Sequence, residues 1–332
     1  MAKALKVGFL GGVGEIGKNM TILEYGESLI IIDSGLTFPT EEMPGIDIVI
    51  PSMQYVRENK ARIKGIFLTH GHEDHIGSMP FLMEDIDAPI YASELTLKLV
   101  EHKLRERGIK NPNYCIVKPG DTVDAGEMKV EFFHMCHSIA GAFALAIYTP
   151  KGIVFHSGDF KIDYTPVDGG YMNFGKLGQL GDRGVLLMLG ESTNVEREGH
   201  TVSERVVGET IDKIFAANEG RRIILATFAS NVHRLQQVIE IALKYDRYIA
   251  FNGRSMLNVA EIGKALGILK VSPDRIIDLD RKSKKIPEER MVILSTGSQG
   301  EPMSALTRMA TGKSNRINVG KNDTIIISAS PI

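Results

Sequence analysis

The sequence predicts an α/β protein whose two halves differ in how strands and helices alternate. Up to about residue 203, short apolar or β-branched runs follow one another with few helical segments, which favours sheets covered by helices, an α/β sandwich. From about residue 204, strand-like runs alternate with helical segments, and crossovers of that length favour parallel strands in a doubly wound sheet. We therefore expect two domains, residues 1–203 and 204–332.

The first half is predicted to be rich in strands, each bounded by Gly, Pro, Asp or Asn. The runs are KVGFL, TILEYG, SLIIID, GIFLT, PIYAS, MKVEFF, FALAIYT and GIVFHSGD. Two helices are expected to interrupt them, at residues 76–86 and 93–107. Ser93 is the candidate N-cap of the second helix, because its hydroxyl can accept a hydrogen bond from an unpaired N–H of the first turn.

In the second half the strand-like runs are RRIILATF, YIAFNG, MVILSTG and TIIISAS, and helices are expected at 231–244, 255–266 and 301–310. The charged run DRKSKKIPEER is expected to be a solvated loop, with a supporting basic patch as the alternative. The sequence stops at Ile332, just after an apolar strand, so we expect this chain to be part of a longer polypeptide.

Composition excludes several classes of protein. The formal net charge is −2 over 332 residues, so any binding of nucleic acid must use a local groove or metal ions. The two cysteines, Cys115 and Cys136, exclude a disulfide scaffold and suit a reducing cytoplasm. No stretch approaches the roughly 20 apolar residues of a membrane span, and the start lacks a signal-peptide pattern. We expect a cytoplasmic protein without a membrane partner.

The glycine-rich run GVGEIG at residues 12–17 matches the G-x-G-x-x-G fingerprint of dinucleotide-binding proteins, and Asp33 ends the next strand. That fingerprint needs a helix between the two strands, because the helix N-terminus binds the pyrophosphate. Only KNMTILEYGES separates Gly17 from Leu29, which is too short for a helix and a parallel return. We therefore predict a hairpin with a tight glycine loop close to a ligand.

The run FLTHGHEDHIGSMP at residues 67–80 gathers three histidines and two acids directly after an apolar strand. Residues two apart share a side on an extended chain but not on a helix, so His70 and His72 converge only at a strand end or loop. Asp74 and His75 then begin a helix and face a second point. Two ligand pairs without cysteine indicate Zn²⁺ or Mn²⁺ in an open, catalytic site rather than a structural one. The alternative is a solvated polar turn.

This H-x-H-x-D-H stretch resembles the signature of the metallo-β-lactamase superfamily, whose fold is an αββα sandwich. Further pieces occur in that superfamily's order: Asp33 in SLIIIDSG resembles its first acidic motif, His137 in CHSIAGAFAL its next metal ligand, and Asp159 in FHSGDF its bridging carboxylate. The resemblance implies two metals, one oxygen ligand being shared between them. The implied metal ligands are His70, His72, Asp74, His75, His137 and Asp159.

Other side chains near these motifs are weaker candidates for metal ligands. His134 in FFHMCHS is the alternative to His137, which we favour because it follows the strand. His156 is expected to pack or to support a ligand, and Cys136 to be a buried reduced thiol. His102 is expected at the surface of an amphipathic helix, and His200 carries no strong signal.

Motifs along the whole chain are similar to those of bacterial ribonuclease J, of the β-CASP nuclease group. They are GGVGEIGKN, THGHEDHIG, HTVSERVVGE, ATFASNVHRLQQ, FNGRSM and STGSQGEPMSALTRMA. The resemblance implies a doubly wound β-CASP domain inserted into the metallo-β-lactamase domain, both incomplete here. The resemblance also implies that Glu191, in LMLGESTN, corresponds to the acidic residue of a motif that is specific to the β-CASP nucleases.

The resemblance implies a cytoplasmic ribonuclease that cleaves RNA internally and degrades it 5′→3′ from a 5′-monophosphate, as a homodimer or homotetramer. In the complete enzyme two Zn²⁺ ions, with Mn²⁺ or Mg²⁺ as alternatives, activate a hydroxide that attacks phosphorus in line. The catalytic residues it implies are Asp33, Asp74 and Glu191, with Asp33 orienting ligands or water.

A phosphate contact is expected where the strand in ATFASNVHRLQQ runs into a helix, because a helix N-terminus offers unpaired N–H groups and partial positive charge. By resemblance, Ser230, Asn231 and Val232 contact the RNA backbone or its 5′ phosphate. Simple N-capping is the alternative. The similar turn STGSQGEP at 295–302 is a further candidate.

The later family motifs, an H-x-S-G-H turn and a final histidine ligand, are absent from this sequence. We therefore expect one metal to bind firmly and a second weakly, with little or no nuclease activity. The rival functions are a DNA-directed β-CASP nuclease, a glyoxalase II-like hydrolase of a small substrate, and a non-catalytic RNA-binding scaffold.

Overall fold

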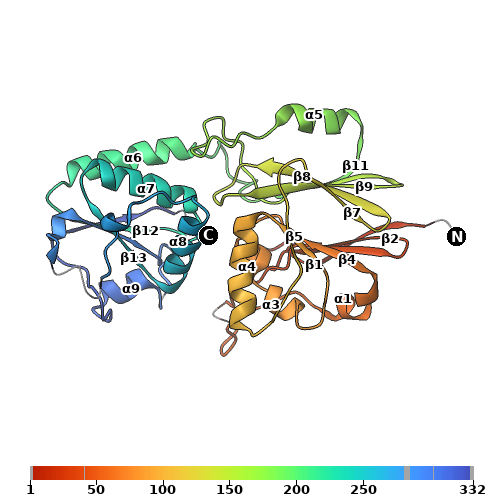
Figure 1. Cartoon of the computed structure of the whole chain (residues 1–332), viewed down its shortest axis with the longest axis horizontal. Coiled ribbons are helices and arrows are strands. Elements are labelled where there is room, and N and C mark those ends of the chain that lie inside the picture. Colours follow the sequence, from red (N-terminus) through yellow and green to blue (C-terminus); the bar gives the residue numbers. More distant parts are fainter. Residues whose placement is uncertain (1–2, 41, 280–284, 302, 330–332) are drawn as a thin grey trace. The chain divides into compact units, whose positions relative to one another are not determined.

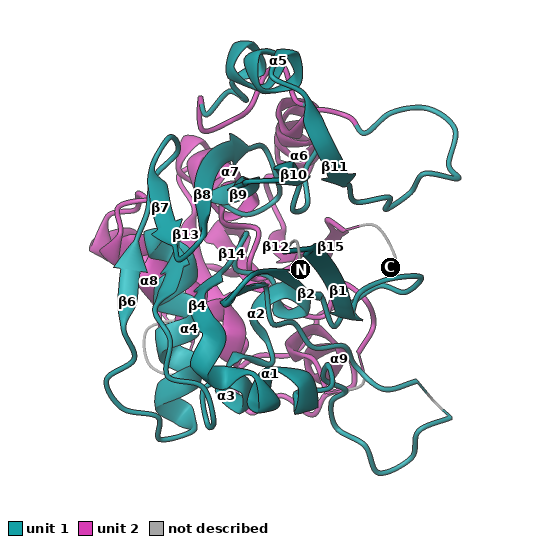
Figure 2. Ribbon diagram, turned by 90° about the vertical axis from the view of Figure 1, so that its right-hand side faces the viewer, with its two compact units in different colours: residues 1–162, 170–201 teal, residues 163–169, 202–332 magenta. Residues whose placement is uncertain are grey.

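The computed structural model describes residues 3–329 apart from residues 41, 280–284 and 302, and has a mixed α/β architecture (Figure 1). It divides into two compact units (Figure 2). Unit 1 comprises Met1–Ile162 and Gly170–Thr201, and unit 2 comprises Asp163–Gly169 and Val202–Ile332. The short segment 163–169 therefore belongs to unit 2, although it lies within unit 1 in the sequence. The domain division expected after residue 203 stays a prediction.

The first sheet of unit 1 has the strand order β1-β2-β3-β4-β5-β6. Its strands are β1 (Leu5–Gly11), β2 (Met20–Tyr25), β3 (Ser28–Ile32), β4 (Ile63–Phe67), β5 (Ile90–Ala92) and β6 (Tyr114–Ile116). The pairs from β1 to β3 are antiparallel and those from β3 to β6 are parallel. Because β3 and β4 run in the same direction, their carboxyl ends lie at the same edge of the sheet.

Strand β3 shows why this sheet must be covered on both faces. All five of its residues are buried, and successive side chains on a strand point to opposite faces. Leu29 and Ile31 pack into a core with the helices, whereas Ile30 and Ile32 pack into a second core with the other sheet. The uninterrupted apolar run SLIII is therefore required by burial on two sides.

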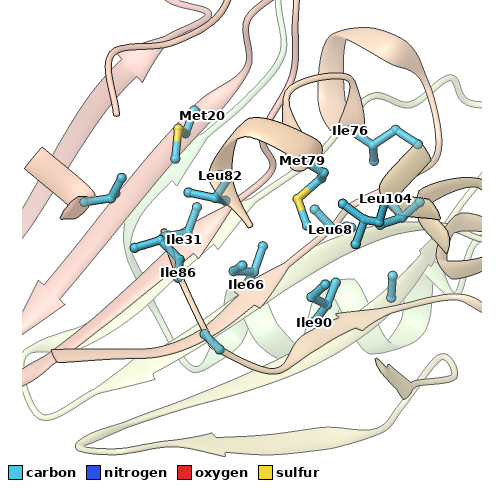
Figure 3. Close-up of a cluster of buried hydrophobic side chains, with 14 of the residues drawn as sticks. Met20, Ile31, Ile66, Leu68, Ile76, Met79, Leu82, Ile86, Ile90 and Leu104 are labelled. Atoms are coloured by element: carbon cyan, nitrogen blue, oxygen red, sulfur yellow. The ribbon is translucent and has the colours of Figure 1, made fainter. Parts of the chain in front are cut away.

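Helices cover the outer face of this sheet, and Figure 3 shows their contact with it through Ile66 and Leu68 of the strand segment and Met79, Leu82 and Leu104 of the helices. These elements are α1 (Gln54–Glu58), η1 (Lys60–Arg62), α2 (Glu73–Ile76), α3 (Met79–Leu82) and α4 (Glu94–Glu106). The helix expected at 93–107 is confirmed, and Ser93 accepts a hydrogen bond from the Thr96 amide as its N-cap.

The single helix expected at 76–86 is wrong. The chain forms two four-residue helices instead, α2 and α3, with Gly77 and Ser78 between them. Pro80 lacks an N–H and cannot donate to the carbonyl of Ile76, so the first helix cannot continue through it. The Ser78 amide donates to the Ser34 carbonyl instead, 2.9 Å away.

The second sheet of unit 1 has the order β11-β10-β9-β8-β7. Its strands are β7 (Thr122–Ala125), β8 (Met128–Met135), β9 (Ala142–Thr149), β10 (Gly152–His156) and β11 (Val185–Leu189). Both β8 and β10 are antiparallel to β9, so β8 and β10 end at the same edge. Helix α5 (Phe174–Asp182) packs Leu177 and Leu180 against a core on this sheet. The layers are therefore helix, sheet, sheet and helix.

Unit 2 contains a parallel sheet of order β13-β14-β12-β15. Its elements are β12 (Arg222–Ala226), β13 (Tyr248–Asn252), β14 (Met291–Ser295), β15 (Asp323–Ile327), α6 (Glu204–Ala217), α7 (Val232–Lys244), α8 (Arg254–Ala265), α9 (Ala305–Ala310), and the 3-10 turns η2 (Pro273–Arg275) and η4 (Glu288–Arg290). Alternating strands and helices in a parallel sheet confirm the doubly wound layout predicted for this half.

Of the three helices predicted in this half, α7 and α8 have the expected boundaries and α9 does not, and α6 was not predicted. The helix expected from residue 301 begins at Ala305, because Gly300 has a φ of +77° and Ser304 caps the helix by accepting from the Thr307 amide. In the charged run 280–290, residues 280–284 lie outside the described residues, as does residue 330 of the last expected strand.

The glycine loop at residues 12–17 joins β1 to β2, which pair antiparallel, so the predicted hairpin is confirmed. Gly12, Gly14 and Gly17 have φ values of +85°, +72° and +100°, which disfavour other residues. The strand that follows is antiparallel, so the loop does not have the dinucleotide-binding layout. In the part of the chain that the structure describes, none of the helices has the length and apolar character to cross a bilayer.

Candidate metal centre

Strand direction brings four distant segments to one place in unit 1. Asp33 follows β3 and Thr69 lies just beyond β4, and these strands are parallel neighbours. His137 follows β8 and Asp159 follows β10, which end at a common edge of the second sheet. Because the two sheets face each other across one apolar core, the polar residues beyond their strand ends meet.

Asp33 lies at the base of the centre, 1% exposed and with a φ of +61°. Its Oδ1 accepts from the Thr69 amide at 2.7 Å, and its Oδ2 accepts from the Thr69 hydroxyl at 2.8 Å. The same Oδ2 lies 2.8 Å from Nδ1 of His75. An ionised carboxylate can only accept, so His75 carries a proton on Nδ1 and directs Nε2 away from Asp33.

The described residues contain two groups of side chains whose ligand atoms lie within 4.8 Å of one another. The first group is His70, His72, His137 and Asp159, and the second is Asp74, His75 and Asp159. Asp159 is common to both. Its Oδ1 lies 3.3 Å from His75 Nε2, whereas its Oδ2 lies 3.8 Å from Nε2 of both His70 and His137. One carboxylate oxygen thus faces each group.

The histidines of the first group have the spacing of ligands around one ion. Nδ1 of His72 lies 3.0 Å from Nε2 of His70 and 3.0 Å from Nε2 of His137. In a tetrahedral zinc site with Zn–N bonds of about 2.0–2.1 Å, neighbouring nitrogens are about 3.3 Å apart. The donor set and its spacing therefore fit a divalent cation.

Electrostatics leave the first group uncharged apart from Asp159. Burial lowers the pKa of His137 to about 4, and burial together with the neighbouring imidazoles lowers the pKa values of His70 and His72 well below the ordinary value. All three imidazoles are therefore neutral near pH 7 and can act as ligands.

The second group behaves differently. Burial lowers the pKa of His75, but Asp159, Asp33 and Asp74 together hold it well above the ordinary value. Burial raises the pKa of Asp159, but the charge on His75 and its hydrogen bond outweigh burial and hold the pKa below the ordinary value. Burial raises the pKa of Asp74. In the metal-free protein these acidic neighbours therefore favour the protonated form of His75.

Comparisons with known proteins agree with this geometry. Residues 13–194 match the family model of the metallo-β-lactamase superfamily. The chain belongs to that superfamily. Residues 220–332 match the model of the ribonuclease J β-CASP domain, so the predicted family resemblance and the predicted fold class, an αββα sandwich with a doubly wound β-CASP domain, are confirmed.

Several curated relatives are named Ribonuclease J. The protein from Synechocystis is 44% identical over 99% of this chain and 52% of its own length, and that from Thermus thermophilus is 42% identical over 97% and 57%. The chain therefore spans about half the length of the curated relatives it matches. A solved structure from Enterococcus faecalis, of unknown function, has a TM-score of 0.66 at 18% identity, covering 88% of this chain and 77% of its own; it shows the fold alone.

Other histidines of this superfamily member lie outside the two groups. His134 Nε2 lies 2.8 Å from the carbonyl oxygen of Gly170, and His156 Nδ1 accepts from the Gly158 amide at 3.1 Å. His102 is half-exposed on α4, 3.9 Å from Glu106. His200 is exposed. Cys136 is buried.

The structure places Glu191 beyond β11 and in neither ligand group of the described residues. Its amide donates to the Ser157 hydroxyl at 3.0 Å, and its carboxylate accepts from the Thr193 amide at 2.7 Å. Ser157 lies two residues before Asp159, so Glu191 contacts the loop that carries the shared carboxylate. A catalytic role for Glu191 stays a prediction.

The three residues expected to contact RNA lie in unit 2, around the start of α7. Asn231 is the N-cap, and its Oδ1 accepts from the Arg234 amide at 3.0 Å. Ser230 is half-buried, whereas the side chain of Val232 is fully buried and its amide donates to the Ser230 carbonyl at 2.8 Å. Capping by Asn231 is observed, and phosphate binding stays a prediction.

Two contributors were not identified from the sequence. Asn19 lies directly after the glycine hairpin loop, and its Nδ2 is 3.1 Å from His75 Nε2 and 3.4 Å from Asp74 Oδ2. Thr69 joins Asp33 to His70, its hydroxyl being 3.0 Å from His70 Nδ1. A threonine immediately before the first ligand histidine was the signal available for Thr69.

Proposed function

We propose that the protein is a metal-dependent ribonuclease that hydrolyses RNA phosphodiesters, both internally and 5′→3′ from a 5′-monophosphate end. The observation that carries this proposal is the pair of ligand groups sharing Asp159. The relatives named Ribonuclease J support RNA as the substrate class. We also propose a cytoplasmic setting, a homodimer or homotetramer, and domains of residues 1–203 and 204–332.

Zn²⁺ is the proposed metal, since three neutral imidazoles and one carboxylate in the first group suit it. The second group has two carboxylates and one imidazole and would also accept Mn²⁺ or Mg²⁺. When bound, two such ions lower the pKa of water toward about 7 and stabilise charge on phosphoryl oxygens.

Residues of the chain itself would orient the ligands of this site and balance the positive charge of the metals. Asp33 holds the His75 proton on Nδ1, which leaves Nε2 for a ligand role. Asp159 presents one oxygen to each group, and Asp74 adds negative charge beside His75. We propose that Asp33, Asp74 and Glu191 are the residues required for catalysis besides the remaining ligands.

We propose that Ser230, Asn231 and Val232 contact an RNA phosphate in unit 2. The 13-residue helix α7 begins there, and its first-turn N–H groups and dipole favour an anion. The half-buried Ser230 hydroxyl is the side chain best placed to donate to it, because Asn231 already caps the helix.

The test is to incubate the protein with 5′-monophosphorylated RNA, 5′-triphosphorylated RNA and DNA of the same sequence, with Mn²⁺ or Zn²⁺ and with chelator. We expect chelator-sensitive cleavage of RNA that is abolished in His137→Asn and retained in the control His102→Asn. Activity is expected to be weak, because the second group has three ligand residues in the described chain against four in the first.

The same experiment, with a small thioester added as a further substrate, separates the rival functions. Preferential cleavage of DNA would replace the proposal by a DNA-directed nuclease. RNA that is bound in the presence of chelator and never cleaved would indicate a binding scaffold. Hydrolysis of a small thioester with RNA left intact would indicate a glyoxalase II-like enzyme.

A further inference from the structure

The loop after β10 passes from the proposed metal centre into unit 2 within a few residues. Asp159 belongs to both ligand groups, and the Lys161 amide donates to the Cys136 carbonyl at 2.8 Å, also in unit 1. Asp163 already belongs to unit 2 (Figure 2). Since successive Cα atoms are about 3.8 Å apart, Asp159 and Asp163 are at most about 15 Å apart along the chain.

Asp163 is held firmly at the start of α6. It is 5% exposed, and its Oδ2 accepts from the Glu204 amide and the Ser203 hydroxyl, each at 3.2 Å. Its Oδ1 accepts from the Thr165 amide at 2.9 Å. The first-turn N–H groups and the dipole of a 14-residue helix favour a carboxylate there, which explains why an acid is buried at this position.

The rest of the segment 163–169, which we call the strap, is also fixed within unit 2. The Thr165 hydroxyl lies 2.8 Å from that of Ser203, next to α6. Asp168 lies 3.5 Å from Nε2 of His233 in the first turn of α7. The strap is therefore attached to the starts of both helices, and one of them is the helix proposed to meet RNA.

We propose that Asp163 is a positioning residue for the metal centre. By fixing the strap to α6, it sets where the chain leaves the metal loop and so holds the Asp159 carboxylate between the two ligand groups. This inference rests on the proposed function, because it takes Asp159 as a ligand. Binding free energies are reciprocal, so a metal that orders Asp159 must also stabilise the contact between the strap and α6.

Hydrogen–deuterium exchange of the wild-type protein tests the reciprocal effect without any substitution. Adding Mn²⁺ should slow exchange in the ligand loops and also at the amides of Thr165 and Glu204, both of which donate to Asp163. Slowing that stops at Ile162 would overturn the inference while leaving the proposed metal centre intact. No slowing at His70–His75 either would refute the metal centre itself.

Asp163→Asn provides the second test, since it keeps the side-chain size but removes the charge and one acceptor. We expect Mn²⁺ affinity to fall about ten-fold, the lower end for residues that support a ligand. Asp212→Asn is the matched control, the same change made within α6 itself, where the carboxylate pairs with Lys244 at 2.8 Å. If Asp163→Asn binds Mn²⁺ as tightly as the control variant, the inference is contradicted. Thermal unfolding of both variants distinguishes a loss of folding from a loss of positioning.

Discussion

Replacing Asp33 by Asn should weaken the binding of one metal ion and leave the binding of the other nearly unchanged. The Asp33 carboxylate is the acceptor for the Thr69 amide, the Thr69 hydroxyl and His75 Nδ1. If the side-chain oxygen of the introduced Asn still accepts the hydrogen bond from the Thr69 amide, the side-chain NH₂ of that Asn faces Nδ1 of His75. His75 then accepts at Nδ1 and carries its proton on Nε2, the atom that faces Asp159 at 3.3 Å.

The magnitude follows from that change of tautomer. A protonated Nε2 cannot bind a cation. The second group would therefore lose its imidazole ligand unless the proton moves back to Nδ1, which costs free energy. Losing such a supporting partner costs 10–100-fold in metal affinity, or about 1.4–2.8 kcal/mol. The hydrogen bonds from Thr69 to a charged acceptor are also weakened, and each such bond contributes about 1.5–3 kcal/mol to stability.

Calorimetric titration with Mn²⁺, together with metal content after dialysis, would measure both ions. We expect the ion of His70, His72 and His137 to bind with nearly wild-type affinity in Asp33→Asn and the other to weaken 10–100-fold. Asp85→Asn is a control for the substitution itself, because this carboxylate is exposed and pairs with Arg57. Wild-type affinity for both ions would refute the assigned role of Asp33.

Three further outcomes are expected. His137→Asn should abolish binding of the first ion in the same titration, whereas His134→Asn, three residues earlier on β8, should leave it. Chelator should lower the unfolding temperature, since metal at 100 times its Kd adds about 2.7 kcal/mol of stability; an unchanged unfolding temperature would contradict a bound ion. Burial raises the pKa of Glu24, but hydrogen bonds from Tyr55 and Arg62 outweigh burial and lower the pKa. The ionised Glu24 therefore stabilises the fold above pH 4.5, and this contribution is lost as pH falls through the pKa of the folded state. In acid unfolding curves, Glu24→Gln should lose stability less steeply than the wild-type protein.

Sequence reasoning succeeded where one local rule decided the structure. The apolar run SLIIID was predicted to be a strand, and its residues 28–32 form β3. The two-residue spacing of His70 and His72 required an extended segment, and His72 has extended φ and ψ values of −75° and 154°. The parallel sheet of unit 2 followed from the alternation of strands and helices.

It failed where tertiary contacts decide the structure. Strand β11 and helices α5 and α6 were not predicted, because VLLML reads as either a strand or a helix and FGKLGQLGD carries three glycines. The roles of Asn19 and Asp163 depend on partners 55 and 41 residues away. No local pattern reports such distances.

Apolar packing between the sheets, rather than the ligands alone, sets the geometry of the metal centre. Each ligand segment follows a strand that places a side chain in the core between the sheets. Phe132 of β8 belongs to this core and is 0% exposed. Its ring meets Phe143 at 5.3 Å and Phe67 at 6.1 Å between centroids. Phe67 precedes the His70–His75 segment and Phe132 precedes His137, so their contact fixes the separation of two ligand segments.

Phe132→Ala should therefore weaken metal binding although it touches no ligand. The cavity is expected to cost about 3–5 kcal/mol of stability, measured by denaturant unfolding, and the affinity for the first ion should fall because His137 is no longer held toward His72. Phe174→Ala is the control, since that ring is 44% exposed. If Phe132→Ala unfolds more easily yet binds the first ion as tightly as the control, the histidines assemble around the ion by themselves, and the core is not what positions them.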